Sequence, residues 1–271
     1  MKVDIEASAK KQALQGVFDR AASTYGGLRY FPLLGQWLVD VAQIPSGVQV
    51  LDVACGRGAV LFPAAQQVGP HGQVIGIDLS EGMVQETRVV LHRLGLTQAK
   101  VLQMDAEQLE FPDASFDYVL CGFSLQFFPH LEHTLSEFHR VLKPTGQVAV
   151  TTWGEEDQRW SWYGDLRTAY QAVVKLGSQS LDKRDDLFAR FSRAGFTNIQ
   201  IITRELDMIY VDEEEWWTMQ WSISGRAGLE RLEPKRLGQF KAEVFERMQA
   251  LRQADGFHDQ LQAHCTIAKF P

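Results

Sequence analysis

The chain has 271 residues, of which 45% are hydrophobic, and a formal net charge of −7. A chain of this length can bury one sizeable core with an appended cap. The negative charge and the lack of clustered lysine and arginine argue against a surface that follows phosphates, so we expect no nucleic-acid partner. The longest apolar runs have the length of strands, and charges are scattered through residues 1–20. Neither a membrane span nor a secretory signal is therefore expected.

The cysteines and histidines show no spacing typical of a metal site. Cys55, Cys121 and Cys265 lie far apart in the chain, and no HxxxH or HExxH pattern occurs. Small buried residues suffice at the cysteine positions, so we expect them to pack in the interior. Few and unpaired cysteines are typical of a reducing compartment, which predicts a cytoplasmic location and no metal.

The N-terminal part of the chain, residues 5–43, is expected to be helical. A Gly26-Gly27 pair interrupts it. Its large aromatic side chains are Tyr25, Tyr30, Phe31 and Trp37. We therefore predict a helical addition in front of the core.

A buried strand followed by a glycine turn is predicted at residues 48–58, VQVLDVACGRG. The apolar run predicts a strand covered on both faces, and Gly56 and Gly58 fall where the chain turns into a helix at about residues 59–68. Glycines permit positive φ and close approach of a ligand, and the helix N-terminus offers free N–H groups. Open α/β sheets bind nucleotides at such a turn.

Three successive strands of the predicted sheet end in carboxylates. The strands are residues 48–53, 73–77 and 100–104, a fourth follows at 116–122, and the acids are Asp52, Asp78 and Asp105. An acid closing the second strand is placed to accept hydrogen bonds from ribose hydroxyls. Asp78 and Asp105 could instead cap the helix or turn that follows each of them.

The spacing around the glycine turn separates two cofactor classes. The dinucleotide fingerprint requires a third glycine three residues after the second, and this position is Leu61. Asp52 beside the turn would also repel a pyrophosphate. NAD is therefore disfavoured, and an adenosine ligand with a cationic tail is favoured.

Four segments carry a family resemblance: LDVACGRG (51–58), GIDLSEGMV (76–84), QMDAEQLEFPDASFDYVLCGFSLQFF (103–128) and RVLKPTGQVAVTTW (140–153). With them the chain resembles a class I S-adenosylmethionine (SAM) dependent methyltransferase of the small-molecule group similar to ubiquinone and menaquinone biosynthesis enzymes. The resemblance covers about residues 48–153. It implies an α/β, Rossmann-like fold with a seven-stranded, mostly parallel sheet and helices on both faces. It also implies SAM as methyl donor and S-adenosylhomocysteine as product.

Carried over position by position, the resemblance implies how the glycine turn binds the cofactor. Asp52 would support the turn, and the Ala54 carbonyl would take the methionine ammonium. Gly56 and Gly58 would lie under the methionine and the ribose. The commonest form of the motif has glycine where this chain has Ala54, and alanine is a known variant there.

The resemblance also implies the residues around the nucleoside and the sulfonium. Asp78 would hold both ribose hydroxyls, with Leu79 and Met83 packed near the ring. The Asp105 carboxylate and the Ala106 N–H would read the adenine edge. The residues bordering the sulfonium would be Gly122 and Phe123.

The remainder of the chain is expected to complete the sheet and to add a cap. We predict a fifth strand at 147–152, a helix at 184–195, a sixth strand at 199–206 and a seventh at 263–270. We expect N-terminal lid helices at 1–43 and a SAM-binding core at 44–211, which includes a substrate-side segment at 153–183. A helical substrate-cap insertion between strands six and seven is expected at 212–255. The last core strand is expected at 256–271.

Six of the seven tryptophans lie beyond residue 150. They could pack the added helices onto the sheet, or they could line an apolar or aromatic acceptor pocket facing the methyl group. Our candidates for contact with the acceptor are Trp153, Trp216 and Trp217.

The candidates for catalysis are His130 and Tyr25. Several related O-methyltransferases carry a histidine base after the fourth strand. This chain has Gln126 at that position, and we expect Gln126 to contact the acceptor. The nearest histidine is His130. The phrase FDRAASTYG (18–26) resembles the family's lid helix, whose tyrosine closes over the cofactor, and Tyr25 matches that tyrosine. Methyl displacement depends mainly on alignment in a dry site, although a base assists an oxygen nucleophile.

The expected function is SAM-dependent methylation of an apolar or aromatic small molecule at oxygen, nitrogen or carbon. One alternative is a tRNA or rRNA methyltransferase, which should show a basic face or an RNA-binding module. A second alternative is a catalytically silent SAM-binding protein that acts through partners. The sequence leaves the acceptor, the methylated atom and the oligomeric state open.

Overall fold

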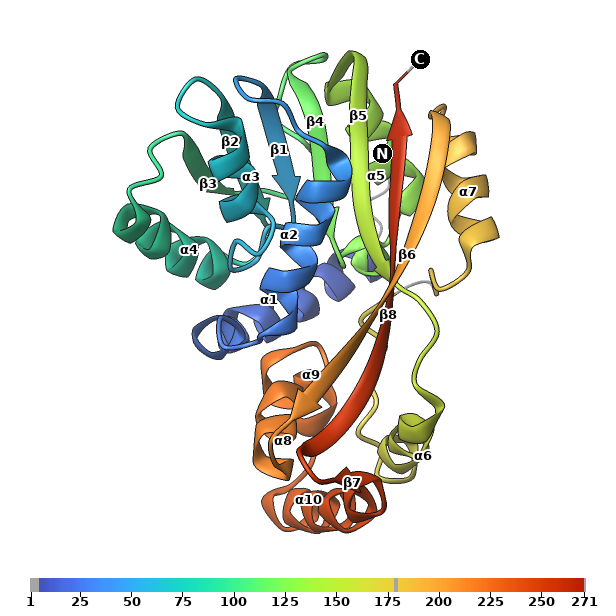
Figure 1. The fold of residues 1–271 in the computed structure, drawn as a ribbon. Coiled ribbons are helices and arrows are strands. Elements are labelled where there is room, and N and C mark those ends of the chain that lie inside the picture. The colour runs from blue at the N-terminus through green and yellow to red at the C-terminus, as the bar shows by residue number, and fades with distance from the viewer. Residues whose placement is uncertain (1–4, 178–179, 271) are drawn as a thin grey trace.

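The computed structural model of the protein describes residues 5–177 and 180–270. Its centre is a twisted sheet in which seven strands are hydrogen-bonded in the order β3-β2-β1-β4-β5-β8-β6 (Figure 1). Strands β1 to β5 pair in parallel, whereas β8 is antiparallel to both β5 and β6. This arrangement confirms the predicted α/β fold with a seven-stranded, mostly parallel sheet.

A short additional strand, β7 (Arg252–Gln253), pairs with the beginning of β8. The seven longer strands are β1 (Gln49–Val53), β2 (Gln73–Asp78), β3 (Ala99–Gln103), β4 (Phe116–Gly122), β5 (Leu142–Trp153), β6 (Thr197–Tyr210) and β8 (Gly256–Lys269).

Helices cover both faces of the sheet (Figure 1). Helices α2, α3 and α4 pack into the buried cluster on one face, and α5 and α7 pack into the cluster on the other.

Among the described residues, no helix is both long and apolar enough to cross a lipid bilayer. The helices are α1 (Ile5–Tyr25), α2 (Tyr30–Ala42), α3 (Leu61–Val68), α4 (Glu81–Leu94), α5 (Leu131–Val141), α6 (Ser161–Ala169), α7 (Arg184–Arg193), α8 (Glu213–Ser222), α9 (Arg226–Leu229) and α10 (Pro234–Met248), with 3-10 turns η1 (Leu125–Phe127), η2 (Gln158–Trp160) and η3 (Gln249–Leu251).

The central strand β1 sends alternate side chains into the two cores, as predicted for a strand covered on both faces. Val50 belongs to the cluster on the side of α2, α3 and α4, whereas Leu51 and Val53 belong to the cluster on the side of α5 and α7. All three are fully buried. Because burial on both faces fixes the strand, it also fixes the position at which the glycine turn begins.

Strands β6 and β8 continue beyond the other strands and carry a second, helical layer. Each has 14 residues, and their antiparallel pairing extends to Tyr210 and Phe257. Helices α6, α8, α9 and α10 surround the far end of this two-stranded arm (Figure 1). The predicted helical insertion is thus present as α8, α9 and α10. Both strands are longer than the predicted ranges 199–206 and 263–270. The prediction was too short because polar residues interrupt the apolar pattern outside these ranges.

Helix α1 lies across the carboxyl ends of the parallel strands, between the core and the helical layer. The Asp19 carboxylate accepts hydrogen bonds from the Ser80 hydroxyl (2.6 Å) and the Gly82 N–H (3.0 Å), at the start of α4. A carboxylate is favourable at a helix N-terminus. On the other side, the Arg20 guanidinium pairs with the Glu230 carboxylate (2.5 Å). These contacts hold α1 over the strand ends.

Candidate active site

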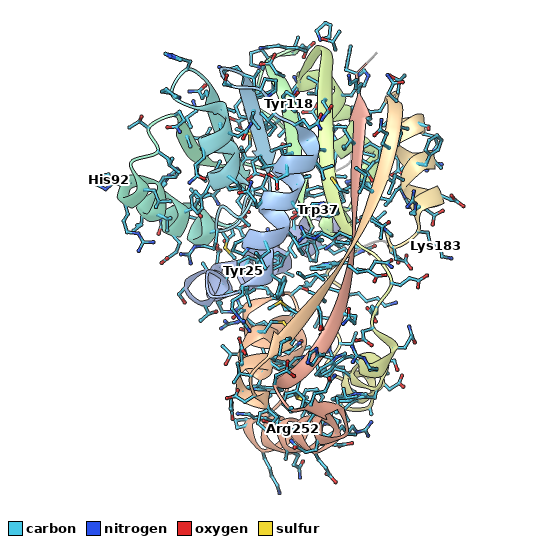
Figure 2. All side chains as sticks on the ribbon, viewed as in Figure 1. Tyr25, Trp37, His92, Tyr118, Lys183 and Arg252 are labelled. Carbon is cyan, nitrogen blue, oxygen red and sulfur yellow. The ribbon has the colours of Figure 1, made fainter. Side chains whose placement is uncertain are left out.

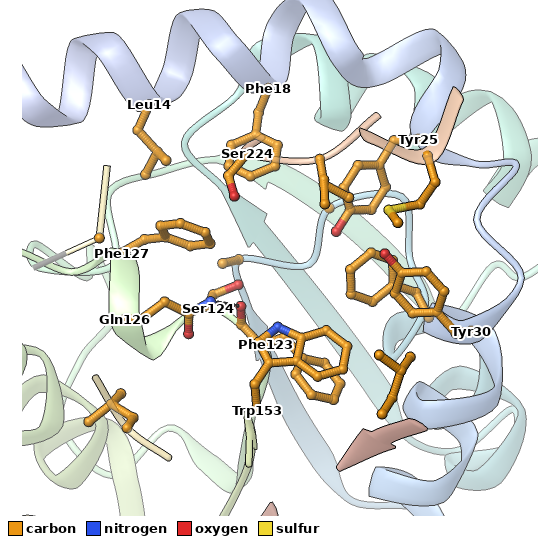
Figure 3. A pocket seen from close by; sticks show the side chains of 18 of the residues that line it. Leu14, Phe18, Tyr25, Tyr30, Phe123, Ser124, Gln126, Phe127, Trp153 and Ser224 are labelled. Atoms are coloured by element: carbon orange, nitrogen blue, oxygen red, sulfur yellow. Dashed lines mark hydrogen bonds between the residues drawn. The ribbon is translucent and has the colours of Figure 1, made fainter. Parts of the chain in front are cut away.

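A cavity of about 740 Å³ lies under α1, between the carboxyl ends of the parallel strands and the helical layer. In Figure 3, α1 supplies Leu14, Phe18 and Tyr25 from above, and Phe123 and Trp153 rise from the strand ends below. Figure 2 places Tyr25 at the level where the core meets the helical layer, well away from Arg252 at the far end of that layer. The cavity therefore joins the carboxyl edge of the parallel strands to the added helices.

Most residues predicted for the site line this one cavity. The predicted residues that line it are Tyr25, Ala54, Gly56, Asp78, Leu79, Met83, Asp105, Ala106, Phe123, Gln126, Trp153 and Trp216. The predicted residues outside its described lining are Asp52, Gly58, Gly122, His130 and Trp217.

The turn after β1 adopts the left-handed conformations that its glycines were predicted to supply. Gly56 and Gly58 have φ of 50° and 83°, and Ala54 also has a positive φ of 54°. A Cβ on Gly58 would lie only 2.5 Å from the Phe62 ring. The Gly56 carbonyl accepts a hydrogen bond from the Thr87 hydroxyl (2.8 Å), so the turn is fixed from α4 while its inner edge stays open to the cavity.

Asp78, at the end of β2, faces the glycine turn. Its Oδ2 accepts a hydrogen bond from the Gly56 N–H (2.8 Å), and its Oδ1 accepts one from the Ser80 N–H (2.8 Å). Burial raises the pKa of Asp78 to about 6, although these two hydrogen bonds act in the opposite direction. Each carboxylate oxygen can accept a second hydrogen bond, so both oxygens can still bind donors from the cavity.

Asp52 lies beneath the turn and does not line the cavity. It is fully buried, and burial together with the nearby Asp78 raises its pKa well above the usual range. Neither of its carboxylate oxygens has a hydrogen-bond partner among the described residues, so its predicted support of the turn stays a prediction.

Asp105, after β3, is held by a lysine that the sequence did not single out. The Lys11 ammonium of α1 lies 2.6 Å from Asp105 Oδ2 and 2.6 Å from Glu107 Oε2. Asp105 Oδ1 accepts a hydrogen bond from the Glu107 N–H (2.9 Å). Burial alone would lower the pKa of Lys11, but its two carboxylate partners outweigh burial and raise it. A lysine on an amphipathic helix gives no local signal of such a partner 94 residues away.

Tyr25, the last residue of α1, lies over the glycine turn. A Cβ on Gly56 would be 3.9 Å from its Cε1. Its ring stacks on Phe31, with ring centroids 5.1 Å apart and an interplanar angle of 12°. Burial raises the pKa of Tyr25 well above its usual value, with smaller contributions from Tyr30 and Asp78. The phenol therefore stays protonated near neutral pH.

Two groups of aromatic side chains line the rest of the cavity. Phe123 has a positive φ of 52° and stacks on Trp153 at 4.1 Å between ring centroids. In the second group, Trp160 and Trp216 are nearly parallel at 5.3 Å, and Tyr163 packs edge-on against Trp216 at 4.8 Å. The first group comes from the ends of β4 and β5, and the second from the helical layer. The cavity thus has an aromatic chamber beyond the glycine turn.

Gln126 and His130, the two polar residues predicted after β4, occupy different environments. Gln126 lines the cavity, and its side-chain amide donates to the Phe123 carbonyl (2.8 Å). The His130 ring lies 3.1 Å from the Glu107 carboxylate, and its backbone N–H donates to the same carboxylate (2.7 Å). No histidine occurs in the described lining of the cavity. The position of His130 gives no support to its predicted role as a catalytic base.

The adjacent tryptophans Trp216 and Trp217 are also separated by the structure. Trp216 lines the cavity. Trp217 packs against Phe240 and Phe245 instead, at 6.0 and 6.3 Å between ring centroids. Successive residues of a helix face different directions, so only Trp216 is placed to contact an acceptor.

Several polar residues of the aromatic chamber were missed by the sequence analysis. They come from α2, α6 and the β6–β8 arm, and they are Tyr30, Tyr163, Arg167, Tyr210 and Asp259. The sequence marks Tyr30 only as a large aromatic residue, and no local pattern shows that these five residues meet, because they come from distant segments of the chain. In the described part of the chain, no cluster of three or more His, Cys, Asp or Glu side chains is arranged to hold a metal ion.

Comparison with known proteins identifies the family. The family described as "Methyltransferase domain" matches residues 50–146. Aklanonic acid methyltransferase DauC of Streptomyces sp. (strain C5) is 41% identical over 149 residues, which cover 54% of this chain and 67% of the relative. Nocamycin O-methyltransferase of Saccharothrix syringae is 32% identical over 252 residues, which cover 86% and 90%. The chain is a SAM-dependent methyltransferase.

One further relative supports the family assignment, and two solved structures share the fold. Demethylmenaquinone methyltransferase of Geobacillus kaustophilus is 30% identical over 71% of the chain and 92% of the relative. A SAM-dependent methyltransferase from Aquifex aeolicus has a similar fold, with a TM-score of 0.53, 18% identity and coverage of 88% and 89%. The YcgJ protein of Bacillus subtilis matches with a TM-score of 0.60, 19% identity and coverage of 89% and 98%. The methyltransferase therefore uses SAM as methyl donor and methylates a small molecule.

Proposed function

We propose that this methyltransferase transfers the SAM methyl group to an apolar, aromatic small molecule bound in the aromatic chamber. The observation that supports this proposal most directly is the single cavity that joins the glycine turn to that chamber. Apolar walls with a few convergent polar groups are typical of small-molecule sites. The curated relatives are named for small molecules, namely aklanonic acid, nocamycin and demethylmenaquinone.

The residues around the turn fit SAM. A backbone without Cβ at Gly56 leaves room for close approach, and Asp78 retains acceptor capacity for two ribose hydroxyls. We propose that the Ala54 carbonyl binds the methionine ammonium and that Asp105 and the Ala106 N–H bind the adenine edge. Leu79 and Met83 would pack against the nucleoside. Asp52, Gly58 and Gly122 would act from behind the lining, by shaping the turn and the end of β4.

The protein's part in the reaction is to align and to desolvate. SAM supplies a methyl group on a sulfonium, which makes that carbon electrophilic. Tyr25 closes the cavity over the turn, and the stacked Phe123 and Trp153 form an apolar wall that excludes water. Gln126 is placed to orient the acceptor. Since alignment in a dry site can lower a displacement barrier by several kcal/mol, no strong base is required.

We assign three parts of the chain to this task. The described residues of 1–43 would form the lid side of the cavity, and the core at 44–211 would bind the cofactor. The described residues of 153–183 and 212–255 would form the acceptor side, and those of 256–271 would complete the sheet. We also place the reaction in the cytoplasm, because all three cysteines are free and buried.

Two measurements test the proposal. Calorimetry should detect binding of SAM and S-adenosylhomocysteine without added metal. Incubation with methyl-labelled SAM and a metabolite extract, followed by mass spectrometry, should reveal a labelled aromatic product. Labelled RNA with no labelled metabolite would favour the tRNA or rRNA alternative, and cofactor binding without any labelled product would favour the silent SAM-binding alternative.

A further inference from the structure

Asp259, on β8, places a carboxyl group on an otherwise apolar face. Side chains at alternate positions of a strand share one face. On β8 the neighbours of Asp259 on that face include Phe257 and Ala263, both essentially fully buried, and its partner across the β6–β8 pair is Met208, which is 6% exposed. The carboxyl group nevertheless lines the cavity.

The Asp259 carboxyl group has no protein partner among the described residues. The hydrogen bonds and ion pairs found there include none to its oxygens. Asp259 is partly buried, and a carboxyl group that loses part of its hydration without gaining a hydrogen-bond partner is destabilised. Tyr30 and Tyr210 lie near enough for Asp259 to contribute to the rise of their pKa values, after the larger effect of burial. Two neutral phenols and one carboxyl group thus converge on the chamber.

The position of Asp259 along β8 separates it from the methyl-transfer end. Trp153, which stacks on Phe123, pairs with Ala263 in the sheet. Asp259 precedes Ala263 by four residues, which places it roughly 13 Å further along the strand. It therefore faces the part of an acceptor that is remote from the transferred methyl group.

The charged groups that contribute to the pKa of Asp259 are themselves paired or exposed. Burial is the largest cause that raises its pKa to about 7, and the further contributions come from Asp157, Arg159, Glu156 and Asp207. Asp157 is paired with Arg159 at 2.5 Å, and Asp207 is paired with His258 at 2.7 Å. Glu156 is exposed, so it is screened by water. Arg167 of α6 also lines the cavity, whereas the strand face next to Asp259 is apolar at Phe257, Ala263 and Met208.

We propose that Asp259 is a specificity-determining residue that accepts a hydrogen bond from a hydroxyl group at the end of the acceptor remote from the methyl group. This inference rests on the proposed function, since it names a feature of that function's acceptor. A hydroxyl donor loses little solvation on entering an apolar chamber, whereas an ammonium loses much more. A carboxylate on the acceptor would be repelled by Asp259.

Equilibrium dialysis with four naphthalene probes tests the proposal without requiring turnover. The probes are 2-naphthol, 2-methoxynaphthalene, 2-naphthoate and 2-(aminomethyl)naphthalene, each with and without S-adenosylhomocysteine. The wild-type protein should bind 2-naphthol about 10- to 100-fold more tightly than its methyl ether, the range for a hydrogen bond to a charged group. Cofactor binding is measured separately, so its absence would count against the proposed function while the probes still report on Asp259.

Two variants separate the acceptor role of Asp259 from its charge. Asp259→Leu suits the apolar face, so it should fold and should lose the preference for 2-naphthol. Asp259→Asn keeps a neutral acceptor oxygen, so it should retain a smaller preference. For the wild type, binding of 2-naphthol should strengthen by up to about 10-fold between pH 6 and pH 8, because the ionised form of a group with a pKa of about 7 accepts a stronger hydrogen bond than its protonated form. For Asp259→Asn it should not change with pH.

Asp165→Asn, a change of the same chemistry at an exposed site on α6, is the control and should behave as the wild type. Equal binding of 2-naphthol and its methyl ether by the wild type would overturn the proposal, as would an unchanged preference in Asp259→Leu. Tightest binding of 2-naphthoate would point instead to Arg167 and an anionic acceptor. Tightest binding of the amine, lost in Asp259→Leu, would show a cationic acceptor.

Discussion

Asp78 is the residue through which the glycine turn and the cofactor are coupled in our proposal. Its two oxygens already hold the Gly56 and Ser80 N–H groups, and the same oxygens face the cavity. A change at Asp78 therefore removes acceptors for the ligand and also loosens the turn that the ligand lies on. This double dependence makes it the most informative position for testing cofactor binding.

Asp78→Ala should weaken binding of S-adenosylhomocysteine by about 1.5–3 kcal/mol, the range for hydrogen bonds to a charged group. Wild-type affinity should also fall as the pH drops through about 6, because the carboxylate accepts the ribose hydroxyls and protonation below its raised pKa removes that form. The variant should lack this pH dependence. Calorimetry across pH 5–8 measures both effects, with Asp165→Ala as control. Unchanged affinity in a folded Asp78→Ala protein would contradict the assignment.

The residues that sequence reasoning could and could not find differ in how local their signal is. Asp52 lies near the end of one predicted strand, and Asp78 and Asp105 each follow another, so their meeting at one sheet edge could be foreseen. Lys11 and Asp259 reach the cavity only through contacts between distant segments, and no local pattern reports those contacts. His130 was chosen for its place after the fourth strand, but a separation of four residues from Gln126 was enough to place its ring on Glu107 instead of in the cavity.

At the scale of elements, the turn between β1 and α3 depends on its second glycine. Gly58 has a φ of 83°, and the Phe62 ring occupies the space that a Cβ would need. Gly95, after α4, is left-handed as well, with φ of 64° and ψ of 26°, but has open space around it. The two glycines therefore separate the cost of backbone conformation from the cost of steric contact.

Gly58→Ala should lower the free energy of unfolding by about 2–4 kcal/mol, because it combines left-handed strain with overpacking. Gly95→Ala should cost only about 1 kcal/mol, because it carries the left-handed strain alone. Urea denaturation measures both. Equal losses in the two variants would show that the Phe62 ring moves aside freely and that the turn tolerates a side chain.

Helix α1 is held over the cavity partly by Lys11, and this contact should control how often the helix opens. Lys11→Met removes the partner of both Asp105 and Glu107, so amides of α1 should exchange with solvent about 10-fold faster, as expected for a loss near 1.4 kcal/mol. Lys10→Met is the matched control, because Lys10 pairs only with the exposed Glu6 one turn earlier. Hydrogen exchange followed by mass spectrometry gives the comparison. Equal exchange in both variants would mean that the Asp19 and Arg20 contacts alone hold α1.

At the scale of the whole molecule, the fold consists of a predictable core and a less predictable arm. The parallel strands could be located because each is a short apolar run closed by a turn or an acid. The continuation of β6 and β8 could not be located from the sequence. Half of the residues of β8 are polar, and this strand gains its structure only by pairing with β6. That arm carries Tyr210 and Asp259, and it connects to helix α8, which carries Trp216. The residues on the acceptor side of the cavity could therefore be predicted only in part from the sequence.

The adjacent tryptophans of α8 test whether the helical layer forms the acceptor site. Trp216→Ala should raise the acceptor KM by at least about 10-fold and leave S-adenosylhomocysteine affinity nearly unchanged, because Trp216 lines the chamber away from the glycine turn. Trp217→Ala should lower the free energy of unfolding by about 3–5 kcal/mol through the cavity it leaves beside Phe240, with little change in KM while the protein is folded. Trp216→Phe, which keeps an aromatic ring, should restore much of the affinity. If both alanine variants lose stability and neither changes KM, the tryptophans only pack the layer, and the acceptor must bind nearer to Phe123 and Trp153.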